Sequence, residues 1–151
     1  MTDQPAQSVN QLLHALVSAG GSDLHCKVGS APRVRVDGRL RRLQVPDLKP
    51  ADTERIIDEV LPAELVESFR ATHEADFAYS VSGMGRFRVN AYQARGTYGV
   101  VFRLVAFGAR SLQELGLPEI VGALSLEPRG LVLVTGPTGC GKTTTLASMV
   151  D

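Results

Sequence analysis

Residues 136–143 have the types and spacing that bind a polyphosphate. The run reads, in order, Gly136, Pro137, Thr138, Gly139, Cys140, Gly141, Lys142 and Thr143, and it fits the P-loop pattern. Glycines let successive backbone N–H groups turn toward phosphate oxygens, and a following helix adds its positive end. In such a loop Lys142 would reach the β and γ phosphates, Thr143 would help to hold Mg²⁺, and Thr144 would touch the α phosphate. Gly136 to Thr144 are therefore candidate nucleotide-binding residues.

The segments on either side of this loop support the same prediction. Leu131–Thr135 is rich in apolar and β-branched residues, which predicts a strand, and Lys142–Val150 contains no helix breaker. Strand, glycine loop and helix thus occur in the required order. A dinucleotide-binding pattern does not fit, because the G-x-G-x-x-G that begins with Gly139 and Gly141 ends on Thr144. A glycine-rich turn that binds nothing remains the alternative, although such a turn has no need of the Lys-Thr-Thr run.

The composition limits the class of protein. The 151 residues are 44% hydrophobic, which is enough to bury one or two small cores, and 16 Lys+Arg balance 16 Asp+Glu. This balance argues against a nucleic-acid partner and gives no sign of membrane binding. Cys26 and Cys140 are the only cysteines, and the sequence has no signal peptide or long apolar run. We therefore expect a cytoplasmic protein whose association with a membrane is peripheral at most.

The charges are unevenly distributed along the chain. Residues 52–76 contain eight carboxylates and two arginines, whereas residues 77–113 contain no carboxylate and five arginines. The five are Arg86, Arg88, Arg95, Arg103 and Arg110. A segment in which arginine is the only charged residue suits an anionic partner. The alternative is an alternating strand with a basic exposed face, and the residues alone leave both interpretations open.

The first two thirds of the chain predict a compact α+β domain at residues 1–105. Helices are expected after a capping box at Ser8 and Gln11, from Pro50, and around Leu65. Strands are expected at 24–28, on both sides of an Asp37-Gly38 hairpin turn, and in an antiparallel meander at 76–81, 86–92 and 98–105. In the meander, Phe87, Val89 and Ala91 face one way, and Arg86, Arg88 and Asn90 face the other.

The remaining residues predict the beginning of a second domain. Residues 106–110 form the expected linker, and 111–151 the expected start of this domain. Ser111 and Glu114 suggest another capping box, and a short helix is expected from Glu119 to about Leu124. A helix, a strand, the glycine loop and a second helix then follow in order, so the chain as a whole is expected in the α/β class.

With these residues in view, the chain resembles the type IV pilus retraction, or twitching-motility, ATPases of the secretion-ATPase superfamily. The segments that carry the resemblance are Ser22-Asp23-Leu24-His25, Arg35-Val36-Asp37-Gly38, Asp76-Phe77, Arg86 to Ala91, Arg95-Gly96, Val101-Phe102-Arg103, Leu112 to Gly116, and Pro128 to Thr135. The resemblance implies a PAS-like N-terminal domain at 1–105 followed by the first strand and P-loop helix of a RecA-like core. It also implies a homo-hexamer that uses ATP and Mg²⁺ at the inner face of the cell membrane. Its implied partners are the pilus machinery and an inner-membrane platform protein.

The same resemblance gives the arginine-rich segment a role. Family members supply arginines from the N-terminal domain to the phosphates, and Arg88, Arg95 and Arg103 match those positions. Together with Lys142 they are the candidate catalytic residues, because an arginine at the γ phosphate would stabilise developing charge. The alternative is that these arginines form salt bridges to a neighbouring subunit of the ring.

Two departures from the family pattern bear on these expectations. Cys140 occupies a position where such loops more often have serine, and its small side chain should still fit. The family's general base, second metal-organising strand and histidine segment have no counterpart up to Asp151, so we expect part of a longer motor that binds nucleotide poorly and hydrolyses none. A type II secretion or pilus-assembly ATPase, and a non-catalytic module for oligomerisation or sensing, remain alternatives.

Overall fold

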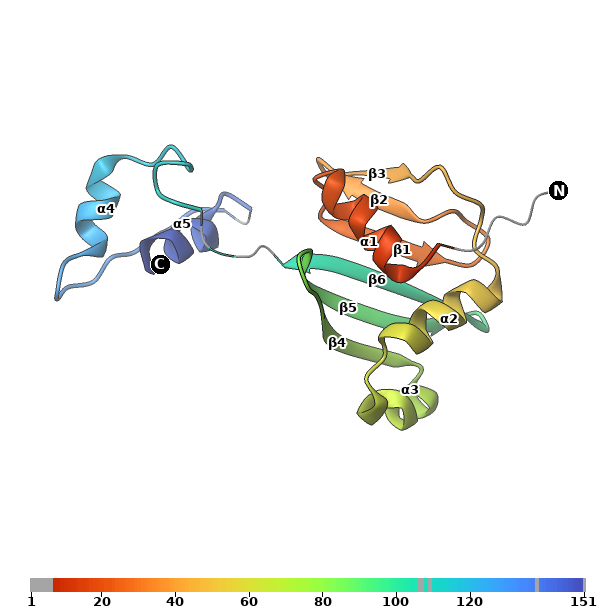
Figure 1. The fold of residues 1–151 in the computed structure, drawn as a ribbon. Helices are drawn as coiled ribbons and strands as arrows, with labels where there is room; N and C mark the ends of the chain where they lie inside the picture. Colours follow the sequence, from red (N-terminus) through yellow and green to blue (C-terminus); the bar gives the residue numbers. More distant parts are fainter. Residues whose placement is uncertain (1–6, 106–107, 109, 138, 151) are drawn as a thin grey trace. The chain divides into compact units, whose positions relative to one another are not determined.

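A computed structural model describes residues 7–105, 108, 110–137 and 139–150. The chain divides into two compact units, Met1–Val105 and Ala106–Asp151, here called unit 1 and unit 2. Each is described by itself (Figure 1). The mixed α/β class predicted from the sequence is confirmed, because unit 1 combines helices with a six-stranded antiparallel sheet.

Unit 1 contains all six strands, in the order β3-β2-β1-β6-β5-β4. Its elements are α1 (Val9–Ser18), β1 (Asp23–Lys27), β2 (Arg33–Val36), β3 (Arg39–Arg42), α2 (Pro50–Val60), the 3₁₀ turn η1 (Ala63–Leu65), α3 (Val66–Thr72), β4 (Glu74–Val81), β5 (Gly85–Ala94) and β6 (Thr97–Val105). The predicted hairpin and meander both form. The pairing of β1 with β6 joins them into one sheet, and the sequence did not predict this pairing.

Local signals explain where the first helix begins and which face it buries. The Oγ of Ser8 accepts a hydrogen bond from the N–H of Gln11 at 3.3 Å, and the Gln11 side chain accepts one from the N–H of Ser8 at 3.0 Å. Apolar residues at helical spacing form the buried side of α1, and they are Val9, Leu12, Leu13 and Leu16. The capping box is as predicted.

Two tight turns set the register of the hairpins. Asp37 and Gly38 connect β2 to β3 with φ of 49° and 76°, and Arg95 and Gly96 connect β5 to β6 with φ of 52° and 76°. Two successive residues with positive φ are typical of type I′ turns, whose twist matches that of paired strands. The predicted loop at 93–97 is therefore shorter than expected, because β5 extends to Ala94 and β6 begins at Thr97.

The two faces of the sheet have different environments. Figure 1 shows α1 and α2 on the same face of the sheet, where Leu24, Phe87, Val89 and Phe102 are completely buried. Side chains on the other face, here called the open face, are mostly polar, as the predicted alternation in β5 requires. Asp23 also lies on the open face, but it is buried there, with only 4% of its surface exposed.

The described residues of unit 2 form two helices, α4 (Glu119–Ser125) and α5 (Lys142–Val150), both as predicted. The strand predicted at Leu131–Thr135 is wrong, because this segment has no regular secondary structure. A strand needs hydrogen-bonded neighbours, and unit 2 has none among the residues that the structure describes. Ser111 and Glu114 do exchange the expected capping hydrogen bonds, but around a single turn rather than a helix.

Candidate functional site

The P-loop segment has a backbone that favours glycine. Gly136, Gly139 and Gly141 have φ of 151°, 84° and 93°, which other residues rarely adopt. A Cβ at Gly136 would also lie 2.7 Å from the Sγ of Cys140, so the exposed Cys140 side chain would have to move to make room for it. At Gly139 and Gly141 a Cβ would meet no atom within 4 Å. Backbone conformation alone therefore accounts for these two glycines.

Lys142 folds back over the loop from the first position of α5. Its Nζ donates a hydrogen bond to the carbonyl oxygen of Pro137 at 2.7 Å. The N–H of Thr145 donates to the carbonyl of Gly141 at 2.9 Å, which closes the first turn of the helix. The N–H groups before Thr145 have no acceptor inside the helix, because the first turn of any helix lacks them. The segment thus combines an ammonium group, free N–H donors and the positive end of a helix.

These groups fit a nucleotide polyphosphate with Mg²⁺. Backbone N–H groups and an ammonium bind phosphate oxygens, and the exposed hydroxyl of Thr143 is the hard oxygen ligand that Mg²⁺ prefers. Among the described residues no three His, Cys, Asp or Glu side chains are grouped to hold a metal. Thr138, also predicted to bind nucleotide, lies outside the described residues.

The two cysteines have opposite environments. Cys140 lies in the P-loop and is exposed, whereas Cys26 lies on the core side of β1, with 1% of its surface exposed. Burial raises the pKa of the Cys26 thiol to about 12, so this thiol stays protonated at neutral pH. Of the two, only Cys140 is open to reagents.

The structure brings two of the three predicted arginines together. Arg88 in β5 and Arg103 in β6 lie directly opposite each other, so their side chains leave the same, open face of the sheet. Both are exposed, and Nη2 of Arg88 lies 3.6 Å from a carboxylate oxygen of Asp76. Arg95 lies in the turn at the far end of β5, about 20 Å from Arg88 at the usual rise per strand residue.

Asp23 connects the arginines of the open face, and sequence reasoning gave it no separate role. Its carboxylate accepts hydrogen bonds from Nε of Arg103 at 2.9 Å and from Oγ of Ser22 at 2.7 Å, and Nε of Arg35 lies 3.3 Å away. Burial by itself raises the pKa of this carboxyl, but the hydrogen bonds from Ser22 and Arg103 and the two guanidinium charges outweigh it. The net pKa is lowered, so Asp23 is charged at neutral pH. The Ser22-Asp23-Leu24-His25 match was the signal that pointed here.

His25 is next to this network on the same face of β1. Its Nε2 is buried and has no hydrogen-bond partner among the described residues. Burial lowers the pKa of His25, and the charges of Arg35 and Arg103 lower it further against the opposing effect of Asp23. His25 is therefore neutral at pH 7.

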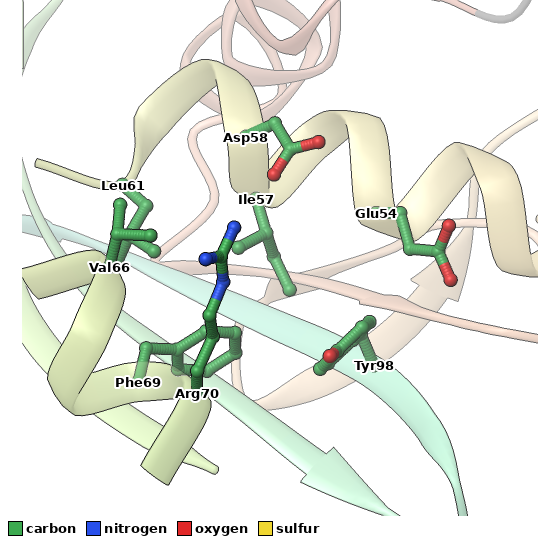
Figure 2. Close-up of a pocket in the computed structure, with 8 residues that line it drawn as sticks. All are labelled: Glu54, Ile57, Asp58, Leu61, Val66, Phe69, Arg70 and Tyr98. Atoms are coloured by element: carbon green, nitrogen blue, oxygen red, sulfur yellow. The ribbon is translucent and has the colours of Figure 1, made fainter. Parts of the chain in front are cut away.

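A pocket of about 330 Å³ lies elsewhere in unit 1, between α2, α3 and the start of β6 (Figure 2). The rings of Phe69 and Tyr98 lie there with their centroids 5.6 Å apart. Arg70 points from α3 toward Asp58 of α2, and Glu54 lies farther along α2 (Figure 2). The volume is within the range of small-molecule sites. None of the predicted site residues lines this pocket.

Comparison with protein families shows which family the chain belongs to. Residues 3–151 match the family model described as "Type II/IV secretion system protein". The chain belongs to this family. Among the described residues no helix is long and apolar enough to cross a membrane.

Two of the relatives are type IV pilus ATPases. The chain is 41% identical over 143 residues to the type IV pilus retractation ATPase PilT of Pseudomonas aeruginosa, covering 95% of this chain and 42% of PilT. It is 40% identical over 140 residues to the type IV pilus ATPase PilU of the same organism, covering 93% of this chain and 37% of PilU. The chain thus spans less than half the length of these relatives.

Solved structures give the same result. The structure of the pilus retraction motor PilT with bound ADP matches with a TM-score of 0.83 and 36% sequence identity, over 96% of this chain and 43% of that one. The Legionella pneumophila ATPase DotB matches with a TM-score of 0.79 at 22% identity, which shows a shared fold. The family to which this chain belongs therefore contains ATPases.

Proposed function

We propose that the chain is the ATP-binding part of a hexameric motor ATPase that powers type IV pilus retraction. The observation that carries this proposal is a P-loop sequence with positive φ at Gly136, Gly139 and Gly141, in a chain 41% identical to a pilus retractation ATPase. The bound ADP in the matching PilT structure supports a nucleotide as the ligand. ATP and Mg²⁺ are the proposed cofactors.

Each group of the P-loop has a distinct part in this proposal. The N–H groups around Gly139 and Gly141 bind phosphate oxygens, and Lys142 exchanges its hydrogen bond with Pro137 for one with the β and γ phosphates. Thr143 holds Mg²⁺, which when bound neutralises phosphate charge. Arg88, Arg95 and Arg103 are proposed to contact phosphate as well, where they would stabilise charge that develops during hydrolysis.

The proposed setting follows from the pilus relatives. We propose a cytoplasmic homo-hexamer at the inner face of the cell membrane, with the pilus machinery and its inner-membrane platform protein as partners. The second candidate is a type II secretion ATPase, since the chain is 34% identical over 150 residues to the type II secretion protein HxcR of Pseudomonas aeruginosa. The higher identity to PilT favours retraction. The pocket beside Phe69 and Tyr98 favours a further alternative, a sensory module in unit 1.

A binding measurement with this chain tests the proposal. Fluorescent ATP should bind in the presence of Mg²⁺, and Lys142→Ala should weaken binding at least tenfold because the ammonium is lost. Thr143→Ala should remove the dependence on Mg²⁺. We expect no ATP turnover by these 151 residues alone. The proposal would be refuted if the wild-type chain did not bind ATP, or if the Lys142→Ala variant bound ATP as tightly as the wild type. Sedimentation with and without ATP would test the hexamer.

A further inference from the structure

A row of charged residues crosses the open face of the sheet in unit 1. In register across four strands it runs Arg35 in β2, Asp23 in β1, Arg103 in β6 and Arg88 in β5. Residues directly opposite each other project from one face, so each of these side chains is next to the one on the adjacent strand. The row holds three cations and one carboxylate. Arg103 and Arg88 are adjacent like charges. Each also has a carboxylate partner, Asp23 at 2.9 Å from Nε of Arg103 and Asp76 at 3.6 Å from Nη2 of Arg88.

Asp23 holds its two arginines in different ways. Arg35 has its Nε 3.3 Å from the carboxylate, and its Nη1 donates to the carbonyl of Gly38 at 3.0 Å, so both ends of this guanidinium are engaged. Arg103 donates only through Nε. Its terminal Nη groups have no protein acceptor among the described residues, and 68% of its side chain is exposed. The Nε of Arg103 is thus held by Asp23, while its two Nη groups remain available to a ligand.

The backbone around Asp23 makes this arrangement rigid. The N–H of Ser22 donates to the carbonyl of Arg35 at 2.9 Å, and the N–H of Leu104 donates to the carbonyl of Ser22 at 2.9 Å. The residue before Asp23 is therefore tied to a strand on each side. The carboxylate itself is 6% exposed and is held by the Ser22 hydroxyl. A buried, hydrogen-bonded carboxylate of this kind can orient a neighbouring guanidinium in advance of ligand binding.

We propose that Asp23 is a positioning residue that presents the free Nη groups of Arg103, next to Arg88, to phosphoryl oxygens. An outer guanidinium fork matches two phosphate oxygens, and its prior orientation reduces the entropy lost on binding. The ligand class is a nucleoside triphosphate, so this inference rests on the function proposed above. Asp23 acts through Arg103 and touches no phosphate itself.

A double-mutant cycle in the intact chain tests this role. MgATP affinity is measured for Asp23→Asn, Arg103→Gln and the double variant. Both single changes should weaken binding about tenfold, and the double variant should be no weaker than Arg103→Gln, since residues that act as one unit are not additive. Asp23→Asn removes a negative charge from a basic face, so long-range electrostatics alone would strengthen binding. Arg35→Gln is the matched control and should change affinity less than twofold.

The outcomes separate this inference from the proposed function. If wild type binds MgATP and folded Asp23→Asn binds it equally well, or if the two changes are additive, the positioning role is wrong while the function stands. A second measurement covers the case in which Asp23→Asn does not fold. Inorganic triphosphate is added to the Lys142→Ala chain, and the NMR signals of the arginine Nε–H groups are followed. Arg103 and Arg88 should shift and Arg35 should not; an unshifted Arg103 would overturn the inference even if the P-loop binds ATP.

Discussion

Unit 1 buries a continuous apolar core, whereas unit 2 leaves its large apolar side chains in contact with water. In unit 1, Phe87 and Phe102 are completely buried among residues from α1, α2 and the sheet. In unit 2 no described residue is buried, and Leu131 and Leu133 are 81% and 73% exposed. The P-loop nevertheless has its characteristic glycine conformations. A short motif can therefore set its own backbone shape without the packed layers that make it rigid.

The two candidate sites differ in the same way. The hydrogen bond from Lys142 to Pro137 spans five residues, whereas the one from Arg103 to Asp23 spans 80. A contact within one turn can be read from spacing, but one between distant strands depends on which strands pair. This difference predicts that the two units respond differently to the same kind of perturbation.

The largest effect should come from a cavity in the core of unit 1. Phe102→Ala removes a completely buried ring and should lower the free energy of unfolding by about 3–5 kcal/mol. The matched control is Leu133→Ala in unit 2, where an exposed side chain should contribute less than about 0.5 kcal/mol. Urea unfolding followed by circular dichroism measures both. A large loss in Leu133→Ala would show that unit 2 has a packed core in solution.

The next effect should be a difference in thiol reactivity. Iodoacetamide should modify Cys140 at least a hundredfold faster than Cys26, because Cys26 becomes accessible only when unit 1 opens, and a hundredfold corresponds to about 2.8 kcal/mol. Mass spectrometry after timed quenching gives both rates, and Cys140→Ser isolates Cys26. MgATP should slow the modification of Cys140 alone. Equal rates for the two thiols would contradict the comparison between the units.

Much of this structure could be predicted from local signals. The capping box at Ser8, the Asp37-Gly38 turn and the alternation in β5 each depend on neighbouring residues, and all three were predicted. The pairing of β1 with β6 was not, because alternation identifies a strand but not its partner. The contacts of Asp23 with Arg103 and Arg35 were missed for the same reason. At Leu131–Thr135 the sequence has a strand's composition, but a strand also requires neighbours.

Acid should destabilise unit 1 through Asp23. Its pKa is lowered in the folded state, so its stabilising contribution is present above the unfolded pKa near 3.8 and is lost as the pH falls through the folded value. The free energy of unfolding of unit 1 should therefore fall by about 1.5–3 kcal/mol below pH 4 through this group, the range for a hydrogen bond to a charged group. Asp23→Asn should be less stable at pH 7 and should show a shallower loss in acid. An identical acid profile in the variant would contradict this assignment.

The smallest effect concerns His25 and the range between pH 7 and pH 5. Its pKa is lowered in the folded state, so the unfolded chain binds the proton more readily, and stability should fall as the pH drops below the unfolded value of about 6.5. The expected change is under about 1 kcal/mol because the side chain is only half-buried. His25→Asn should flatten this slope. All three histidines lie in unit 1. The rate at which iodoacetamide modifies Cys140 in unit 2, corrected for thiol ionisation, should therefore not change with the loss of stability of unit 1. A slope that persists in His25→Asn would show that the proton is taken up elsewhere in unit 1.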